Sequence, residues 1–498
     1  MRRLVLDVLL MAGATGCSRL LGLVRDATIA DRFGTSGAYD AFLIAFFVPH
    51  FLRQLLAEGA LSTAFVPLYT GQRIAGNDAD RFASALLTWL VVLFALVVGF
   101  GVAFAPMYVP FLASGFSSEK LSLAIALTRV VFPFIALVGF SAVFMGILNS
   151  HRRFFVASLA PVWFNVGMIL GVLVLVPRFP QQPALGLAIG VLIGGGGQLL
   201  FQLPALHRVG FRFRPVLWPV HPEIRRLVRL MMPALLTLAV TQVNLLVDNK
   251  LASHLGDGGI ASLQYGMRLF QLPLGVFAVS VATALLPRFS EAWARKDAER
   301  FSAYLSEGVA LGALVLLPAM VGLFVIGADV VRLLFEHGSF TPSDTARATR
   351  VLSFYLIGLF PYGLIYIFSR AAYALKRTRL PLLAAVVGVG INIMFDLVLV
   401  SVMQEAGLAL ATAVAGIVNA SLLGLFLLPR PNVPIRQLGL VSIGCGLLFG
   451  VTWAIRRLVG QSPCAVAVFA PLVAGVTFYV VYVRCTPLWL FIGRLRGH

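Results

Sequence analysis

Residues 82–113 read FASALLTWLVVLFALVVGFGVAFAPMYVPFLA and contain no charged side chain. About 20 such residues, folded as a helix, cross the hydrocarbon core of a bilayer. Comparable apolar runs recur along the 498-residue chain, which is 59% hydrophobic and only 12% charged, whereas a soluble protein carries about 25% charged residues. A transmembrane β-barrel would need segments of about ten alternating residues instead. The sequence therefore predicts an all-α polytopic membrane protein.

Polar positions and Pro/Gly clusters divide the chain into roughly fourteen predicted transmembrane spans. Lys and Arg concentrate in the even-numbered loops and at both ends, so the positive-inside rule predicts that both termini are cytoplasmic. This topology also explains most of the net charge of +19. The sequence has no RNA-binding signature, so nucleic acid is not an expected partner. The predicted spans lie near residues 4–30, 38–71, 82–113, 120–149, 155–177, 183–206, 223–254, 260–290, 303–327, 346–374, 380–403, 406–428, 438–458 and 465–492.

The chain contains an internal repeat with an offset of roughly 220 residues. DADRF at 78–82 matches DAERF at 297–301, and GLA at 186–188 recurs at 407–409. Six spans separate the copies, which predicts two parallel six-helix lobes related by pseudo-two-fold symmetry about the membrane normal, an arrangement typical of transporters. The predicted parts are an N-terminal lobe, a basic cytoplasmic linker, a second lobe and an appended helix pair (spans 13 and 14), over residues 1–206, 207–222, 223–430 and 431–498.

Ionisable residues gather in the first two spans and at the start of the second repeat. At membrane depth such residues are costly and usually face a protein interior or a water-filled cavity. One interpretation is a cationic cavity for an anionic substrate, because the planar arginine fork binds phosphate or carboxylate at two points. The other is a set of structural ion pairs, such as Arg25 with Asp26 or Arg53 with Glu58. The residues concerned are Arg19, Arg25, Asp26, Asp40, Arg53, Glu58, Asp248, Lys250 and Arg268.

A second polar group combines Asn392 and Asp396, four residues apart on one helical face, with Thr412 and Asp248. Carboxylate, amide and hydroxyl oxygens suit a hard cation such as Na⁺, and the Leu408 carbonyl is a further expected ligand. The alternative is interhelical hydrogen bonding with a proton on the aspartate. No HExxH pattern or pair of loop carboxylates indicates catalysis, so we expect a transporter with no cofactor beyond a coupling Na⁺ or H⁺.

Four motifs carry a family resemblance: SRLLGLVRD at 18–26, YDAF at 39–42, AEGALSTAFVP at 57–67 and FEHGSFT at 335–341. They resemble the MurJ (MviN) lipid II flippases of bacteria, and the likeness runs nearly end to end. The resemblance implies the multidrug/oligosaccharidyl-lipid/polysaccharide exporter fold, with spans 13 and 14 forming a groove for a polyprenyl tail. It also implies a protein of the bacterial inner membrane that moves lipid II, an undecaprenyl-diphosphate-linked disaccharide-peptide, to the outer leaflet for peptidoglycan synthesis and cell shape.

The resemblance also assigns residues to roles. It implies a substrate cavity formed by Arg19, Arg25, Asp26, Asp40, Arg53, Glu58 and Arg268, and a sodium site of the type found in some members at Asp248, Asn392, Asp396 and Thr412. Phe47 replaces a lysine of some members, and Met267 stands where an acidic residue is common. Membrane lipids and the cell-wall synthesis machinery are further expected partners.

Two other functions compete with this assignment. The first is a cation-coupled exporter of drugs, or of another polyprenyl-diphosphate oligosaccharide, which shares the fold. The second is a membrane-embedded glycosyltransferase, which needs catalytic carboxylates in a sizeable loop. The longest loops, near 207–222 and 328–345, hold no paired carboxylates.

Overall fold

The computed structural model describes residues 2–54, 61–216, 221–429, 434–459 and 464–489, which form helices and connecting loops with no β-strand among them. The chain divides into two compact units, residues 1–258 and 259–498. The boundary lies beyond the helix that opens the predicted second lobe, so that helix belongs to the first unit. The predicted all-α class is confirmed.

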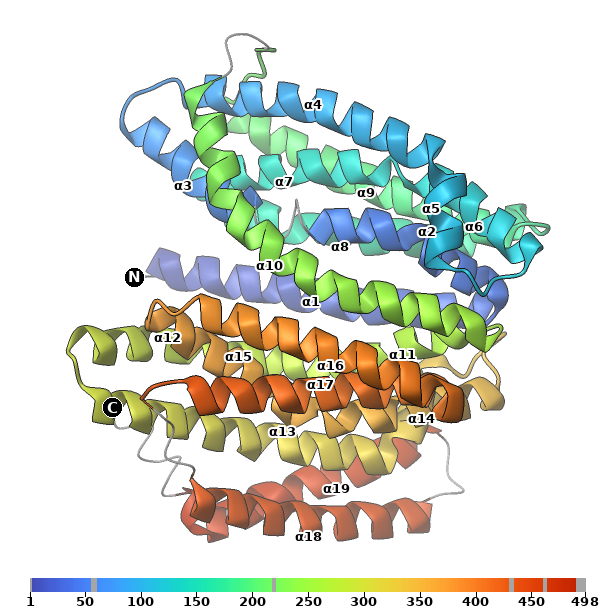
Figure 1. Ribbon diagram of the computed structural model, residues 1–498, viewed down its shortest axis with the longest axis vertical. Helices are drawn as coiled ribbons and strands as arrows, with labels where there is room; N and C mark the ends of the chain where they lie inside the picture. The colour runs from blue at the N-terminus through green and yellow to red at the C-terminus, as the bar shows by residue number, and fades with distance from the viewer. Residues whose placement is uncertain (1, 55–60, 217–220, 430–433, 460–463, 490–498) are drawn as a thin grey trace. The chain divides into compact units, whose positions relative to one another are not determined.

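The first unit is a bundle in which α1 packs along α8, α8 along α9, and α7 against α9 (Figure 1). The helix α10 packs against α3, α4 and α5. Its helices are α1 (Arg2–Phe33), α2 (Gly37–Arg53), α3 (Leu61–Ile74), α4 (Ala79–Ala103), α5 (Ala105–Leu112), α6 (Ser118–Val131), α7 (Phe134–Ser150), α8 (Phe154–Leu170), η2 (Gly171–Leu175), η3 (Val176–Arg178), α9 (Pro183–Arg208), α10 (Pro222–Ala252) and η4 (Ser253–Leu255).

The second unit packs α16 along α17, and α11 against α14. The last two helices, α18 and α19, pack against each other and against α13, so the predicted appended pair is built onto one helix of this unit. Its helices are α11 (Gly259–Pro273), η5 (Leu274–Ala278), α12 (Val279–Ala294), α13 (Ala298–Phe335), α14 (Pro342–Ile357), α15 (Leu359–Ala374), α16 (Arg379–Met403), α17 (Glu405–Phe426), α18 (Ile435–Val459) and α19 (Cys464–Cys485).

Ten helical stretches of the described residues are long and apolar enough to cross a membrane, or up to eleven if the bent pair α14 and α15 is one span. The chain is therefore a multi-pass membrane protein. Helices also occupy the other predicted spans, with α1 over 4–30, α2 and α3 over much of 38–71, and α10 over 223–254. The count of fourteen crossings stays a prediction.

The internal repeat is visible in how two equivalent helices begin. The Asp78 side chain accepts a hydrogen bond from the backbone N–H of Arg81 at 2.9 Å and caps α4, and Asp297 does the same for Arg300 at 2.8 Å and caps α13. Such a cap contributes about 1 kcal/mol to helix stability. The repeated DADRF and DAERF motifs thus encode the same helix start in each unit.

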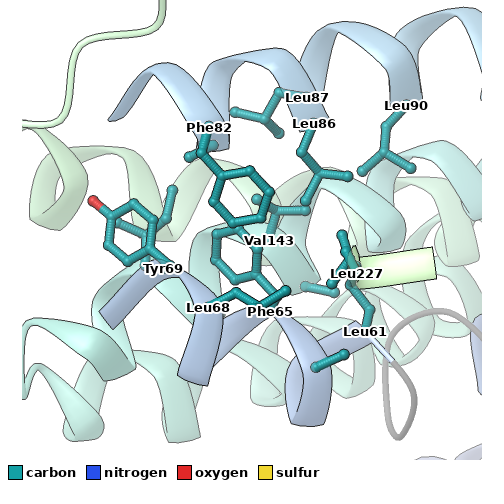
Figure 2. Packing of buried hydrophobic residues seen from close by; sticks show 14 of the residues in the cluster. Leu61, Phe65, Leu68, Tyr69, Phe82, Leu86, Leu87, Leu90, Val143 and Leu227 are labelled. Carbon is teal, nitrogen blue, oxygen red and sulfur yellow. The ribbon is translucent and has the colours of Figure 1, made fainter. Parts of the chain in front are cut away.

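A hydrophobic cluster explains why α10 joins the first unit (Figure 2). Phe65 of α3 and Phe82 of α4 stack with ring centroids 5.5 Å apart, and Leu227 of α10 is buried in the same cluster. His221 caps α10, and burial lowers the pKa of its ring, so the neutral Nδ1 accepts a hydrogen bond from the Glu223 backbone. Burial of these side chains holds α10 against α3 and α4.

Candidate functional site

Arg25 of α1 is buried, with 7% of its surface exposed. Its Nε and Nη2 atoms donate to Oδ1 of Asp26 at 3.0 and 2.7 Å, and its Nη1 donates to Oδ1 of Asn165 on α8 at 2.9 Å. A buried guanidinium is stable only when its charge is paired and its donors are bonded. Arg25 is therefore bonded to acceptors on two helices, Asp26 of α1 and Asn165 of α8.

The helix α8 also contacts Arg53, another arginine of the predicted substrate cavity. The guanidinium carbons of Arg25 and Arg53 lie 5.8 and 5.9 Å from the ring centroid of Phe164, within the range of a cation–π contact. Asn165 donates from Nδ2 to the Ser18 carbonyl of α1 at 3.1 Å. The dipeptide Phe164-Asn165 thus holds the two arginines beside α1.

Arg53 ends α2 in a polar chain that reaches α10. Its Nη2 atom lies 3.5 Å from Nδ1 of His50, and Gln54 Nε2 lies 3.1 Å from Nε2 of the same ring. Gln242 of α10 donates to Oε1 of Gln54 at 2.5 Å. Glu58, the predicted partner of Arg53, lies outside the described residues.

Asp40 of α2 belongs to a separate cluster. Its carboxylate is fully buried, and Oδ2 accepts hydrogen bonds from Lys120 Nζ and from the Gly258 backbone N–H, both at 2.8 Å. Lys120 also pairs with Asp257 at 2.8 Å. Gly258 has φ +83°, and a side chain there would meet the Thr35 carbonyl, so only glycine fits. Asp40 thus bonds the backbone of Gly258, the last residue of the first unit.

The remaining predicted substrate residues are less enclosed. Arg19 is exposed on α1, and Arg268 is half-buried on α11 of the second unit. Lys250 of α10 lies over the Phe111 ring, with Nζ 4.2 Å from the centroid. One cavity that all these side chains line stays a prediction.

The predicted cation ligands of the second unit come from the packed pair α16 and α17. Asn392 and Asp396 are both buried, and the amide Nδ2 of Asn392 donates to Oδ2 of Asp396. Thr412 donates its hydroxyl proton to the Leu408 carbonyl at 3.0 Å, which leaves the lone pairs of the hydroxyl oxygen available to a ligand. These donors fit a hard monovalent cation. The fourth predicted ligand, Asp248, lies on α10 of the first unit, where Asn244 donates to it at 3.4 Å.

The second unit contains an apolar cavity beside α18 and α19, the helices over the predicted spans 13 and 14, and its use by a lipid tail stays a prediction. The helices α11, η5, α13, α18 and α19 line a volume of about 650 Å³, with Leu272, Pro318, Gly322, Leu472 and Val476 among its walls. Arg484 is the single charged residue that lines it within the described part of the chain, and its guanidinium carbon lies 5.5 Å from the Trp489 ring. The cavity suits a long hydrocarbon chain with an anionic end.

Comparisons with known proteins identify the family. The model of the family described as "Lipid II flippase MurJ" matches residues 29–474. The chain belongs to the lipid II flippase MurJ family. A probable lipid II flippase MurJ of Vibrio cholerae is 36% identical over 85% of this chain and 82% of the relative, and one of Thermotoga maritima is 34% identical over 86% of each. The lipid II flippase MurJ of Burkholderia cenocepacia is 33% identical over 85% and 83%.

Solved structures agree with the MurJ assignment. The structure titled "Lipid II flippase MurJ, inward closed conformation" has a TM-score of 0.83 and 29% identity, and the match covers 97% of this chain and 100% of that one. An inward-facing multidrug MATE transporter of the MOP superfamily has a TM-score of 0.70 at 16% identity over 86% of this chain and 95% of that one, which shows a shared fold alone. The predicted family, superfamily fold and transporter class are confirmed.

Several residues of these clusters were not among the site residues predicted from the MurJ motifs, and three of them contact predicted residues directly across the fold. Asn165 holds Arg25, Phe164 contacts two arginines, and Lys120 pairs with Asp40. The one signal in the sequence is that Asn165 is a polar side chain inside the apolar predicted span 155–177. Phe164 and Lys120 carry no signal, because their roles depend on contacts across 80 or more residues of chain.

Proposed function

We propose that the protein carries lipid II from the cytoplasmic to the periplasmic leaflet of the inner membrane by alternating access. The observation that supports this proposal most directly is that Arg25 of α1 and Arg53 of α2 gather around Phe164 and Asn165 of α8, in a chain of the MurJ family. A disaccharide-peptide on a diphosphate does not cross hydrocarbon unaided, because an unpaired charge in a low-dielectric medium is very costly. Arginines in a protein-lined cavity replace the water that the diphosphate loses.

The proposed transport separates the two halves of the substrate. The arginines Arg19, Arg25 and Arg53 of the first unit, and Arg268 of the second, bind the headgroup during transport. The polyprenyl tail stays in lipid or in the groove beside α18 and α19. Hydrocarbon in this groove contacts mostly apolar walls, and Arg484 is placed to attract a phosphate. Both termini face the cytoplasm, as the distribution of Lys and Arg indicates.

The test of this function is complementation. Expression of the chain in a bacterium depleted of its own lipid II flippase is expected to restore growth and to return lipid II to the outer leaflet, measured by its accessibility to an externally added, membrane-impermeant modifying reagent. An untransformed depleted strain, in which lipid II stays in the inner leaflet, is the control. Export of a cationic drug without movement of lipid II would support the competing exporter function and contradict this one.

We further propose that a monovalent cation, Na⁺ before H⁺, binds Asp396, Asn392 and Thr412 of the second unit. Asp396 has no exposed surface, and a buried carboxylate is stable only with a bound cation, a proton or strong hydrogen bonds. The Asn392 amide donates one such bond, and Thr412 of the packed helix α17 offers the lone pairs of its hydroxyl oxygen. A bound cation would balance the charge of the buried carboxylate and couple its gradient to the motion of the second unit.

The cation proposal has a thermal signature. A ligand that binds only the folded protein stabilises it by RT ln(1 + [L]/Kd), about 1.4 kcal/mol at ten times Kd. Sodium, but not potassium at equal ionic strength, is therefore expected to raise the melting temperature of the purified protein, and Asp396→Asn to remove the difference. Asp80→Asn, which removes a carboxylate bonded to the Tyr69 hydroxyl at 2.8 Å, should retain it. Equal effects of the two salts on the native protein would refute a sodium site.

A further inference from the structure

The surroundings of Arg25 have the form of a binding pocket for a guanidinium group. One edge of the guanidinium faces Oδ1 of Asp26, Nη1 bonds Oδ1 of Asn165, and the ring of Phe164 lies 5.8 Å from its central carbon. Carboxylate, amide oxygen and aromatic face are the groups that protein sites use for planar cations. Arg25 and Asn165 are separated by 140 residues, so the tertiary fold assembles this pocket.

The second unit contains a comparable pair of side chains. Asn392 donates to Asp396, which lies four residues later on the same helix. In the first unit the residue four after Asn165 is Ile169, and the carboxylate comes from Asp26 on α1 instead. Each unit therefore combines an asparagine with a buried aspartate, and in the first unit the chain's own guanidinium supplies the cation.

We propose that Asp26, Asn165 and Phe164 form a docking pocket for the Arg25 guanidinium, and that Arg25 leaves this pocket to bind the substrate phosphate. Asp26 and a diphosphate are anions that compete for one planar fork, because the donors that grip a phosphate in two places are bonded to Asp26 in the docked state. Asn165 sets how strongly Arg25 is held in the docked state, because its amide oxygen bonds the guanidinium but carries no charge to neutralise it. The competition between Asp26 and a diphosphate rests on the proposed transport of lipid II, whereas the docking pocket for Arg25 does not.

An empty pocket is expected to accept a free guanidinium ion. In Arg25→Ala, millimolar methylguanidinium should raise the melting temperature in a saturable manner, because it restores the charge beside Asp26. Methylammonium at equal concentration, which lacks the planar fork, should not do so. Arg25→Ala/Asn165→Leu should lose at least half of the methylguanidinium shift. Equal effects of the two cations on Arg25→Ala, or an undiminished shift in the double variant, would overturn the pocket.

Two variants that keep Arg25 provide an independent test should Arg25→Ala fold poorly. Asn165→Asp adds a second carboxylate to the docked guanidinium and loses the Nδ2 bond to the Ser18 carbonyl. Because a hydrogen bond between charged groups contributes more than a neutral one, we expect a higher melting temperature together with slower lipid II transport. Asn165→Leu should lower the melting temperature. Asn419→Asp, at an amide of α17 that packs near Gly388, is the control and should lower the melting temperature. Asn165→Asp lowering both quantities would mean that Asn165 is only structural and would overturn the proposal.

The two readouts separate the pocket from the transport function. Methylguanidinium binding is measured on purified protein without lipid II. A selective shift in a protein that fails to move lipid II would support the pocket and refute the proposed function. Transport of lipid II with no selective shift would refute the pocket alone.

Discussion

Arg25→Ala is expected to abolish complementation of a flippase-depleted strain, and Arg268→Ala to do the same. A hydrogen bond to a charged group contributes about 1.5–3 kcal/mol, so loss of a two-pronged phosphate contact weakens binding by roughly a hundredfold or more. Arg25→Lys should restore only part of the activity, because an ammonium lacks the planar fork. Growth on depletion, with lipid II accessibility in the outer leaflet, is the measurement.

The ion pair with Asp26 dictates the control for this experiment. Arg25→Ala removes the guanidinium that bonds the buried Asp26 carboxylate, and breaking a buried pair in this way costs about 3–5 kcal/mol of folding free energy. The double variant Arg25→Ala/Asp26→Asn also removes the carboxylate charge and should reach the membrane at native levels, yet stay inactive. Normal complementation by this variant and by Arg268→Ala would contradict a phosphate-binding role.

Gly322→Phe is expected to reduce transport by roughly tenfold, because its side chain would fill the apolar groove of the second unit. Gly322 lines the groove, and no atom lies within 4 Å of the position that a Cβ would take there. The phenyl ring would therefore displace hydrocarbon and not protein. Displacing only two methylene groups, at about 0.8 kcal/mol each, accounts for this loss.

The matched control is Gly446→Phe on α18. Gly446 also has open space at its Cβ position, but it is not among the residues that line the groove. Both variants should insert and melt like the native protein, which separates transport from folding. Full transport by Gly322→Phe at native expression would show that the tail does not use this groove.

Hydropathy was sufficient to predict the helices, because a span must satisfy its backbone hydrogen bonds within itself and expose apolar side chains to lipid. The DADRF and DAERF motifs predicted only a repeat, and the structure shows that each encodes an N-cap, which acts within four residues. The place of α10 was not predictable in this way. Leu227 is buried with Phe65 and Phe82, and only the packing of α10 on α3 and α4 assigns it to the first unit.

The features of the site likewise divide into those that the sequence predicted and those that only the structure shows. Sequence motifs identified Arg25, Asp26 and Asp40 as polar residues inside a membrane bundle, where their cost indicates a role. The motifs did not show which partners each side chain bonds. The structure places Arg25 between Asp26 and Asn165, and it places Asp40 with Lys120 and the Gly258 backbone.

The sequence by itself determined that the chain is a helical membrane protein with an internal repeat and a motif set of the MurJ family. These properties follow from composition, periodicity and short motifs, which act locally along the chain. Only the tertiary structure decided which charges pair and which surface forms the groove. Ion pairs and cavities depend on distances between side chains on different helices, such as Asn165 and Arg25, and those distances are set by packing that no local pattern records.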